Sequence, residues 1–215
     1  MILSKKLQLA TISALCAFTA LPALAATNLL ANGSFETPSI AGSDVTYYAE
    51  GSTGITGWTV VGGPIHNTHA NFLPASDGVQ WVDLTGDFGY GKGLRSDTVS
   101  TILGTSYELS FDLGAHELFG SASVSVSING GASQLFSNIY QLPGVMDWER
   151  KTLTWVADAT SAQISFLGAA NGLLSNDGVI GLDNVVLSAV PEPGTWGMLL
   201  AGLGLVGVAA RRRRV

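Results

Sequence analysis

The chain has 215 residues and a formal net charge of −6, with 16 acidic side chains against 10 basic ones. The imbalance is greater between residues 26 and 190, where 15 acids and four bases give −11; the bases are Lys92, Arg95, Arg150 and Lys151. So acidic a segment disfavours nucleic acid and anionic lipid as partners, and it suits a soluble surface protein or one that binds Ca²⁺. Its roughly 165 residues are enough for one domain with an ample core.

The first 25 residues have the pattern of a signal peptide. Lys5 and Lys6 precede an apolar stretch over residues 7–21, which predicts a signal helix. Ala23 and Ala25 then form the small-x-small pattern of a cleavage site. We therefore expect the mature chain to begin at residue 26.

The single cysteine, Cys16, lies inside this apolar stretch. The alternative that Cys16 is a lipid-attachment site is disfavoured because the preceding Leu15 is bulky where such processing needs a small side chain. The mature chain then has no cysteine and no disulfide.

Between residues 26 and 189 apolar side chains recur at every second position, which is typical of β-strands. The clearest alternation covers residues 107–113, 122–128, 153–155 and 162–166. Further strands are expected at residues 56–61, 79–84, 94–99, 134–136 and 180–187. Residues 40–53 and 62–75 are expected to form long loops.

Turn residues separate these segments. Asn129, Gly130 and Gly131 join two alternating runs, which predicts a hairpin turn with positive φ angles. Asp-Gly or Asn-Gly pairs at residues 77–78, 171–172 and 177–178 mark other turns. Roughly nine or ten short strands separated in this way favour an all-β fold, a jelly-roll β-sandwich that forms one domain over residues 26–189.

Residues suited to catalysis are sparse. His66 and His69 have a spacing that can share zinc on a helix, but no helix is predicted there, so we interpret them as exposed loop side chains. No Gly-x-Ser-x-Gly motif occurs. The many acids leave a glycosidase carboxylate pair open as an alternative. Because the domain is small and shows no framework for a deep cleft, we expect no enzymatic activity.

Aromatic residues suggest a different kind of site, because sugar C–H faces stack on exposed rings while hydroxyls pair with carboxylates and amides. The candidate rings are Trp58, Trp81, Phe88, Tyr90, Tyr140 and Trp148. The most suggestive segment is a glycine-rich loop with two rings, an acid and a base: Asp87, Phe88, Tyr90 and Lys92. Trp58, Trp81 and Trp155 lie in strand patterns, which favours positions in the core.

The C-terminal residues form a three-part pattern. Pro191, Glu192 and Pro193 cannot continue a helix or a sheet, so they stay extended and accessible to an enzyme. An apolar run over residues 195–210 follows, somewhat shorter than the ~20 residues of a full membrane crossing, and predicts a transmembrane helix. The terminal arginines are expected to remain cytoplasmic. They are Arg211, Arg212, Arg213 and Arg214.

This tail, residues 190–215, resembles the PEP-CTERM sorting signal of Gram-negative bacteria. The resemblance implies that an exosortase-type membrane enzyme recognises and removes the tail. The chain would be exported, held for a time in the inner membrane, and finally placed at the cell surface or outside the cell. Such tails occur in bacteria that make exopolysaccharide, which suggests a role in biofilm or extracellular matrix.

Five segments of the domain occur in an order that resembles galactose-binding-like jelly rolls. They are residues 28–36, 57–60, 77–84, 104–111 and 182–187. The nearest relatives are bacterial choice-of-anchor exported domains and a related plant cell-wall domain family of unknown function, and carbohydrate-binding modules share the first and last motifs. Fold carries over from such a resemblance further than function does.

In carbohydrate-binding modules of this shape the first and last strands hold a structural Ca²⁺. The resemblance implies Glu36 and Asp183 as carboxylate ligands and Ser34 as a source of a backbone carbonyl, with further oxygens completing the shell. A carboxylate between Leu182 and Val185 needs a reason to be there. The alternative is that Asp183 faces solvent or caps a turn while Asn184 points elsewhere.

The sequence thus favours an exported, non-catalytic module that binds exopolysaccharide or cell-wall glycan. A structural biofilm-matrix protein without a sugar site is the main alternative, because the domain is rich in Ser, Thr and Gly and low in charge. A glycan hydrolase is the third possibility.

Overall fold

The computed structural model describes residues 27–86, 89–116, 118, 120–139, 141, 144–170, 178–190, 197, 199–200 and 202–204. Several predicted features lie outside these residues: the signal peptide with its cleavage site, the Pro-Glu-Pro segment, the arginine cluster, and Asp87 and Phe88 of the candidate sugar loop. No helix among the described residues has the length and apolar character needed to cross a membrane.

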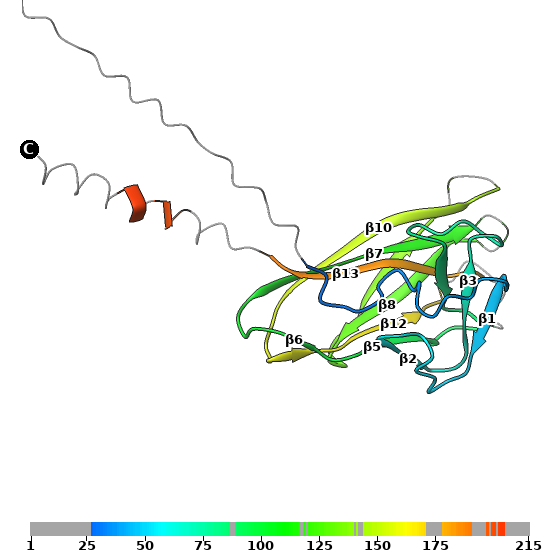
Figure 1. Ribbon diagram of the computed structural model, residues 1–215, viewed down its shortest axis with the longest axis horizontal. Helices are drawn as coiled ribbons and strands as arrows, with labels where there is room; N and C mark the ends of the chain where they lie inside the picture. Colours follow the sequence, from blue (N-terminus) through cyan, green and yellow to red (C-terminus); the bar gives the residue numbers. More distant parts are fainter. Residues whose placement is uncertain are drawn as a thin grey trace, which may run out of the picture.

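Two antiparallel sheets face each other in a sandwich, which confirms the predicted all-β fold (Figure 1). The six-stranded sheet has the order β1 (Val45–Tyr48), β3 (Ile65–His69), β4 (Gln80–Asp83), β13 (Gly181–Ala189), β7 (Ser106–His116) and β10 (Met146–Val156). The five-stranded sheet has the order β2 (Trp58–Val61), β5 (Gly93–Ser96), β12 (Ile164–Gly168), β8 (Ala122–Ile128) and β9 (Gln134–Asn138). A short pair joins β6 (Val99–Ser100) to β11 (Ser161–Ala162).

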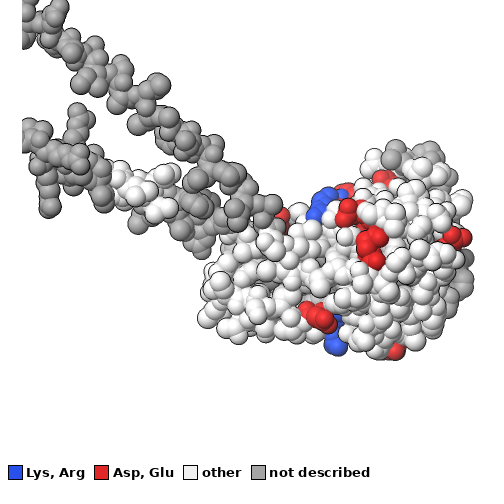
Figure 2. Space-filling model, in the orientation of Figure 1, with Lys and Arg blue, Asp and Glu red and all other residues white. Residues whose placement is uncertain are grey.

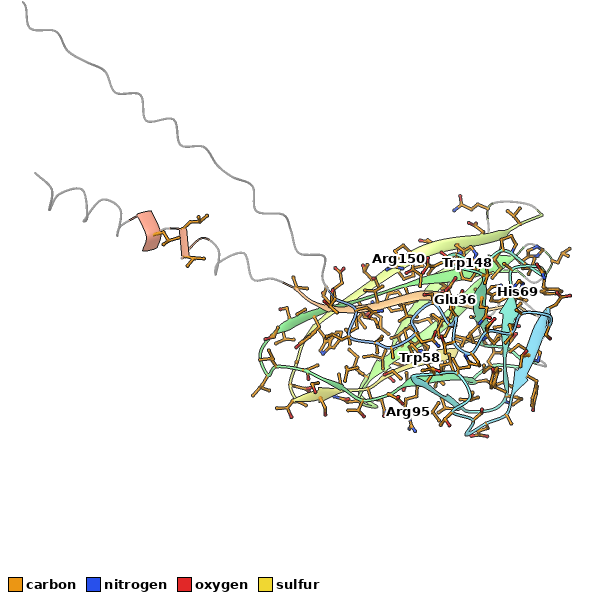
Figure 3. The ribbon with its side chains drawn as sticks, in the orientation of Figure 1. Glu36, Trp58, His69, Arg95, Trp148 and Arg150 are labelled. Carbon is orange, nitrogen blue, oxygen red and sulfur yellow. The ribbon has the colours of Figure 1, made fainter. Side chains whose placement is uncertain are left out.

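The main core fills the space between the sheets with the inward side chains of the alternating strands. Phe111 of β7 and Phe166 of β12 meet edge to face with ring centroids 5.1 Å apart. Trp58, which is 1% exposed, contacts Phe166 and Phe35, as expected for a core residue. Figure 3 shows Trp58 on the side of the five-stranded sheet, whereas Trp148 and Arg150 lie along β10 of the other sheet.

The beginning and the end of the domain lie side by side. The Leu29 N–H donates to the Leu187 carbonyl at 2.8 Å, and Asn28 Nδ2 donates to the Val185 carbonyl at 2.9 Å. A Cβ atom on Gly33 would lie 1.9 Å from the Val185 oxygen, so only glycine permits this approach. The two motifs that the sequence places at opposite ends of the domain therefore pack directly on each other.

Most predicted strands are confirmed, and so is the hairpin turn between β8 and β9, where Asn129 and Gly130 have φ angles of 51° and 68°. Two expected loops are wrong, because residues 40–53 contain β1 and residues 62–75 contain β3. His66 and His69 therefore lie in a strand of the six-stranded sheet and not in an exposed loop. The strand expected at residues 153–155 extends over the whole of β10.

Candidate ligand-binding face

One cross-strand row on the outer face of the six-stranded sheet brings together aromatic, charged and glycine residues. Directly paired positions run across all six strands of the sheet. In order they are Tyr47, His66, Asp83, Gly181, Gly114 and Trp148. Residues that pair directly point to the same face of a sheet, and the main core occupies the opposite face. The row therefore defines a polar and aromatic surface that points away from the core.

The two glycines form a floor for larger side chains. A Cβ on Gly114 would lie 2.3 Å from Met146 Cε, and one on Gly181 would lie 2.4 Å from the same atom. Both would also lie within 2.8 Å of the Trp148 ring. Because neither glycine carries a side chain, Met146 and Trp148 can pack closely against the backbone of the sheet here.

A second apolar cluster builds on this floor. Trp81 is fully buried and meets Trp148 edge to face at 5.8 Å, and Met146 and Val179 pack beside them. The two indole N–H groups donate to the carbonyls of Leu73 and Pro74, each at 2.9 Å. The cluster thus fastens the segment between β3 and β4 onto the outer face. Trp81 is buried as predicted, but in this outer cluster and not in the main core.

A pocket of about 260 Å³ opens beside this cluster. Its lining comprises Val45, His66, Thr68, Phe72, Trp81, Asp83, Thr85, Gly86, Gly178 and Val179. Phe72 is 51% exposed, and Tyr47, whose ring centroid lies 6.1 Å from that of His66, is 53% exposed. Two accessible rings therefore lie in and beside a concave site with a polar wall.

Asp83 is the carboxylate of that wall. Its Oδ1 accepts from Thr85 Oγ1 at 2.7 Å, from the Thr85 N–H at 2.9 Å and from the Ile180 N–H at 3.2 Å. Burial raises the pKa of Asp83 above its ordinary value, although these hydrogen bonds and the charge of His66 lower it. Among the residues that the structure describes, Asp83 is the one acidic residue of the pocket lining.

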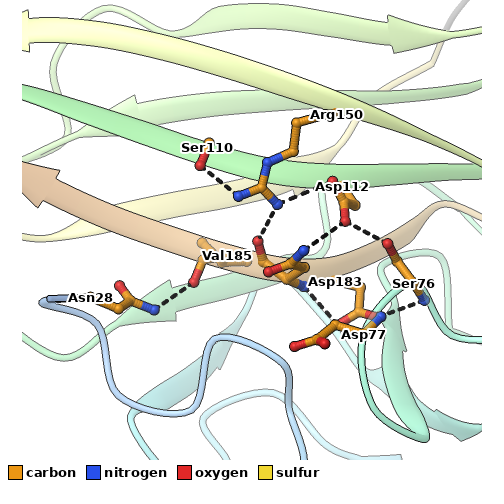
Figure 4. A network of polar contacts seen from close by, with 9 residues as sticks. Asn28, Ser76, Asp77, Ser110, Asp112, Arg150, Asp183 and Val185 are labelled. Atoms are coloured by element: carbon orange, nitrogen blue, oxygen red, sulfur yellow. Dashed lines mark hydrogen bonds and ion pairs between the residues drawn. The ribbon is translucent and has the colours of Figure 1, made fainter. Parts of the chain in front are cut away.

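Asp183, a predicted calcium ligand, lies in a polar network next to the glycine floor (Figure 4). It is fully buried at an irregularity of β13, and its carboxylate accepts the N–H groups of Ser76, Asp77 and Asn184 at 2.8, 2.8 and 2.6 Å. Burial raises the pKa of Asp183 to about 7. Of the two alternatives for this residue, solvent exposure is wrong, and the carboxylate does cap the turn at residues 76–77.

The neighbouring residues complete the network. Arg150 donates to Asp112 Oδ1 at 3.1 Å, to the Asn184 carbonyl at 2.7 Å and to Ser110 Oγ at 2.7 Å. The Asn184 side chain and the Ser76 hydroxyl both donate to Asp112 Oδ2. Asp112 thus accepts hydrogen bonds from three side chains, whereas the described donors to Asp183 are backbone N–H groups.

Glu36 binds the backbone at the other end of the segment formed by residues 76–80. Its Oε1 accepts the N–H groups of Val79 and Gln80 at 2.7 and 2.8 Å. Among the described residues, no three His, Cys, Asp or Glu side chains lie close enough to share a metal ion. The carboxylates of Glu36 and Asp183 accept hydrogen bonds from the backbone of residues 76–80. The Ca²⁺ site with Ser34, Glu36 and Asp183 stays a prediction.

The chain leads directly from the pocket lining into the candidate sugar loop. Thr85 and Gly86 line the pocket, and the chain then enters residues 87–88, which lie outside the described part. Tyr90 packs against the main core and is partly buried, and Lys92 Nζ donates to the Thr85 carbonyl at 3.2 Å. The structure thus gives Tyr90 and Lys92 structural contacts, and their role in ligand binding stays a prediction.

Two strands of the sequence also carry a local indication of the pocket. In residues 80–83 a tryptophan and an aspartate occupy alternate positions of a strand, and in residues 65–69 His66 and Thr68 do the same. Both patterns indicate a polar and aromatic outer face. What could not be seen was that the two strands are neighbours, which places His66 opposite Asp83.

These observations define the class of protein: a β-sandwich with a pocket on one outer face, followed by an export motif. Residues 189–214 match the PEP-CTERM protein-sorting motif, which confirms the predicted tail and marks an exported protein that an exosortase processes after transient membrane anchoring. The chain belongs to the family described as "Protein of unknown function (DUF642)", whose model matches residues 28–187. No curated protein matches the chain.

Similar solved structures include TmCBM61 in complex with β-1,4-galactotriose, at 19% identity and a TM-score of 0.45, covering 77% of this chain and 100% of that one. Another is the CBM22-1 xylan-binding domain of Paenibacillus barcinonensis Xyn10C, at 17% identity and a TM-score of 0.43, covering 68% and 94%. A third is CBM35 of the same organism, at 13% identity and a TM-score of 0.42, covering 67% and 99%.

Proposed function

We propose that this domain is a non-catalytic carbohydrate-binding module that binds exopolysaccharide or cell-wall glycan in the pocket on the outer face of the six-stranded sheet. It would act at the cell surface or in the extracellular matrix of a Gram-negative bacterium. The observation that carries the proposal is the combination, in and beside one pocket of about 260 Å³, of two accessible rings and a buried carboxylate.

The residue types suit a sugar because a sugar ring has an apolar C–H face and a rim of hydroxyl groups. Phe72 and Tyr47 offer rings of about half exposure on which a C–H face can stack. Asp83, His66 and Thr68 offer polar groups for the rim. The pocket volume of about 260 Å³ lies just below the roughly 300–1,000 Å³ typical of small-molecule sites, which suits one sugar unit of a longer chain better than a large ligand.

The acidic character of the surface fits a neutral glycan better than an anionic one. The segment between residues 26 and 190 carries a formal charge of −11, and acidic side chains outnumber basic ones over the face seen in Figure 2. Repulsion would weaken binding of a uronic-acid or sulfated polymer in low salt. We therefore expect neutral glycans among the best ligands.

The test is a glycan-array and exopolysaccharide binding measurement with the processed, secreted protein. Phe72→Ala and Asp83→Asn should each weaken saturable binding by at least tenfold, which corresponds to about 1.4 kcal/mol. Val79→Ala is the matched control, because Val79 is 48% exposed in the same region but does not line the pocket. Phe88→Ala tests the loop predicted from the sequence.

Three outcomes separate the candidates. Binding that is lost in Phe72→Ala but kept in Val79→Ala supports the pocket. Binding that depends only on Phe88 moves the site to residues 87–92. A folded protein that binds no glycan overturns the proposal and favours a structural matrix protein.

A further inference from the structure

One end of the sandwich carries an exposed apolar tip, which we define as Ile102, Leu103 and Val156. Their exposed fractions are 70%, 64% and 58%. Ile102 and Leu103 lie in the turn between β6 and β7, and Val156 is the last residue of β10, paired with Ser106 of β7. Large apolar side chains that are exposed together on a protein surface usually mark a site that contacts another molecule or a membrane.

The turn that presents the tip is firmly held. The Ile102 N–H donates to the Tyr107 hydroxyl at 2.9 Å, and the Thr105 N–H donates to the Ile102 carbonyl at 3.0 Å. The Gly104 N–H donates to the Ala157 carbonyl at 2.8 Å, and the Ala157 N–H donates to the Thr105 carbonyl at 2.9 Å. The backbone hydrogen bonds are thus made within the protein, while the side chains of Ile102 and Leu103 point outward.

The tip lies where the chain leaves the domain for the sorting motif. Ala189 pairs with Tyr107, and the Val190 N–H donates to the Ser106 carbonyl at 2.8 Å. Val190 therefore lies next to the same end of β7 that carries the turn. In Figure 1 this is the end of the sandwich at which β13 and β6 terminate.

The length of the connection brings this end to the membrane. Only residues 191–194 separate Val190 from the apolar run that begins at residue 195. Five extended steps span at most about 17 Å. The polar headgroup region on each side of a bilayer is itself roughly 5–8 Å thick. While the tail is in the membrane, the end of the domain must therefore face the headgroups at close range.

We propose that the apolar tip inserts into the lipid headgroup region while the sorting motif anchors the chain. The inference rests on the membrane anchoring of the PEP-CTERM tail and is independent of glycan binding. Insertion would hold the domain in one orientation beside the tail and so present residues 191–193 to the processing enzyme in a constant geometry. The partner is a zwitterionic lipid surface, because the domain is strongly acidic and Glu108 and Asp158, both exposed, lie near the tip. On the face seen in Figure 2, few charged side chains lie at this end of the domain.

The test places an environment-sensitive fluorophore at the tip of the full chain reconstituted in phosphatidylcholine–phosphatidylethanolamine vesicles. Ile102→Cys, made in a Cys16→Ser background, carries the probe. Ile139→Cys is the matched control, because Ile139 is 65% exposed and follows Asn138, which binds the Leu113 and Asp147 carbonyls near the other end of β7. We expect a blue-shifted emission, quenched by lipid-attached quenchers, at position 102 only. Adding phosphatidylglycerol should weaken the effect.

Equal and water-like emission at both positions would overturn the proposal. A blue shift at position 102 that persists in the processed protein without vesicles and grows with concentration would assign the tip to self-association instead. A second measurement follows removal of the tail in cells, where Ile102→Ser combined with Leu103→Ser should slow processing and Ile139→Ser should not. The substituted side chains are exposed, so the melting temperature of each variant should remain that of the wild type. If Ile102→Ser combined with Leu103→Ser leaves the rate of processing unchanged, the tip does not help to present residues 191–193 to the processing enzyme.

Discussion

Replacement of Gly181 by alanine should release the aromatic cluster from the outer face. Gly181 has no positive φ angle, so its backbone tolerates alanine, but the added Cβ would lie 2.4 Å from Met146 Cε and 2.8 Å from the Trp148 ring. Real Cβ atoms do not approach neighbours so closely, so both side chains must move. The effect is therefore one of packing and not of backbone strain.

The expected magnitude follows from the contacts that would be lost. Displacing Trp148 removes its edge-to-face contact with Trp81, worth about 0.5–1.5 kcal/mol, and the hydrogen bond to the Pro74 carbonyl, worth about 0.5–1.5 kcal/mol. Overpacking alone costs about 1–3 kcal/mol. Since these contributions overlap, we expect the free energy of unfolding to fall by about 2–4 kcal/mol.

Equilibrium unfolding in urea, followed by tryptophan fluorescence, measures this change. Gly131→Ala is the control, because a Cβ there would meet only the Ile128 carbonyl, at 3.2 Å, and the gain from reduced chain entropy is the same in both variants. The control should remain within about 0.5 kcal/mol of the wild type. Equal stability of the two variants would show that the glycine floor does not support Met146 and Trp148.

Three further predictions concern charge, metal and sorting. Burial raises the pKa of Asp183 from 3.8 in the unfolded chain to about 7 in the folded protein, so between these pH values the folded protein holds a proton that the unfolded chain has released. The stability that this residue contributes is therefore fully present below pH 3.8 and is lost as the pH rises through about 7. Unfolding in EDTA should therefore be harder at about pH 5 than at about pH 8, and Asp183→Asn should reduce the difference; a slope unchanged in that variant would contradict the assignment. If Ca²⁺ binds through Glu36 and Asp183, adding it at about pH 8 should raise the melting temperature of the wild type but not of Glu36→Ala, and no shift in the wild type rules the ion out. Deleting residues 191–193 should leave an unprocessed membrane form on a blot, and a normal mature size would argue against exosortase processing.

Period-two alternation predicted most strands well, and for β8 it predicted the bounds to the residue. It failed for β10 because the apolar residues of that strand change face. Met146 and Trp148 pack in the outer cluster, whereas Leu153 and Trp155 pack against the main core, so no single alternation runs through the strand. A pattern method assumes one buried face per strand, and β10 has a different buried face at each end.

The strand β3 was missed for a related reason. Asn67 and Thr68 are polar but almost fully buried, and His66 faces the pocket, so the segment has few of the apolar residues that indicate a strand. The pocket itself depends on pairings between distant segments, such as His66 with Asp83 and Asp83 with Gly181. Such registers follow from the packing of the whole sandwich and cannot be obtained from local patterns.

The two proposed surfaces lie at different positions along the sandwich, and this arrangement has a functional consequence. Asp83 pairs with Gly181, which pairs with Gly114 of β7. Gly114 lies eight residues from Ser106, or about 27 Å at the usual rise of ~3.4 Å per residue. The pocket is therefore separated by most of the length of β7 from the end that carries the apolar tip. A glycan could thus occupy the pocket while the tip contacts lipid, because neither surface covers the other. Ligand capture need not wait for removal of the tail, and the precursor and the processed protein would differ in location and not in the architecture of the pocket.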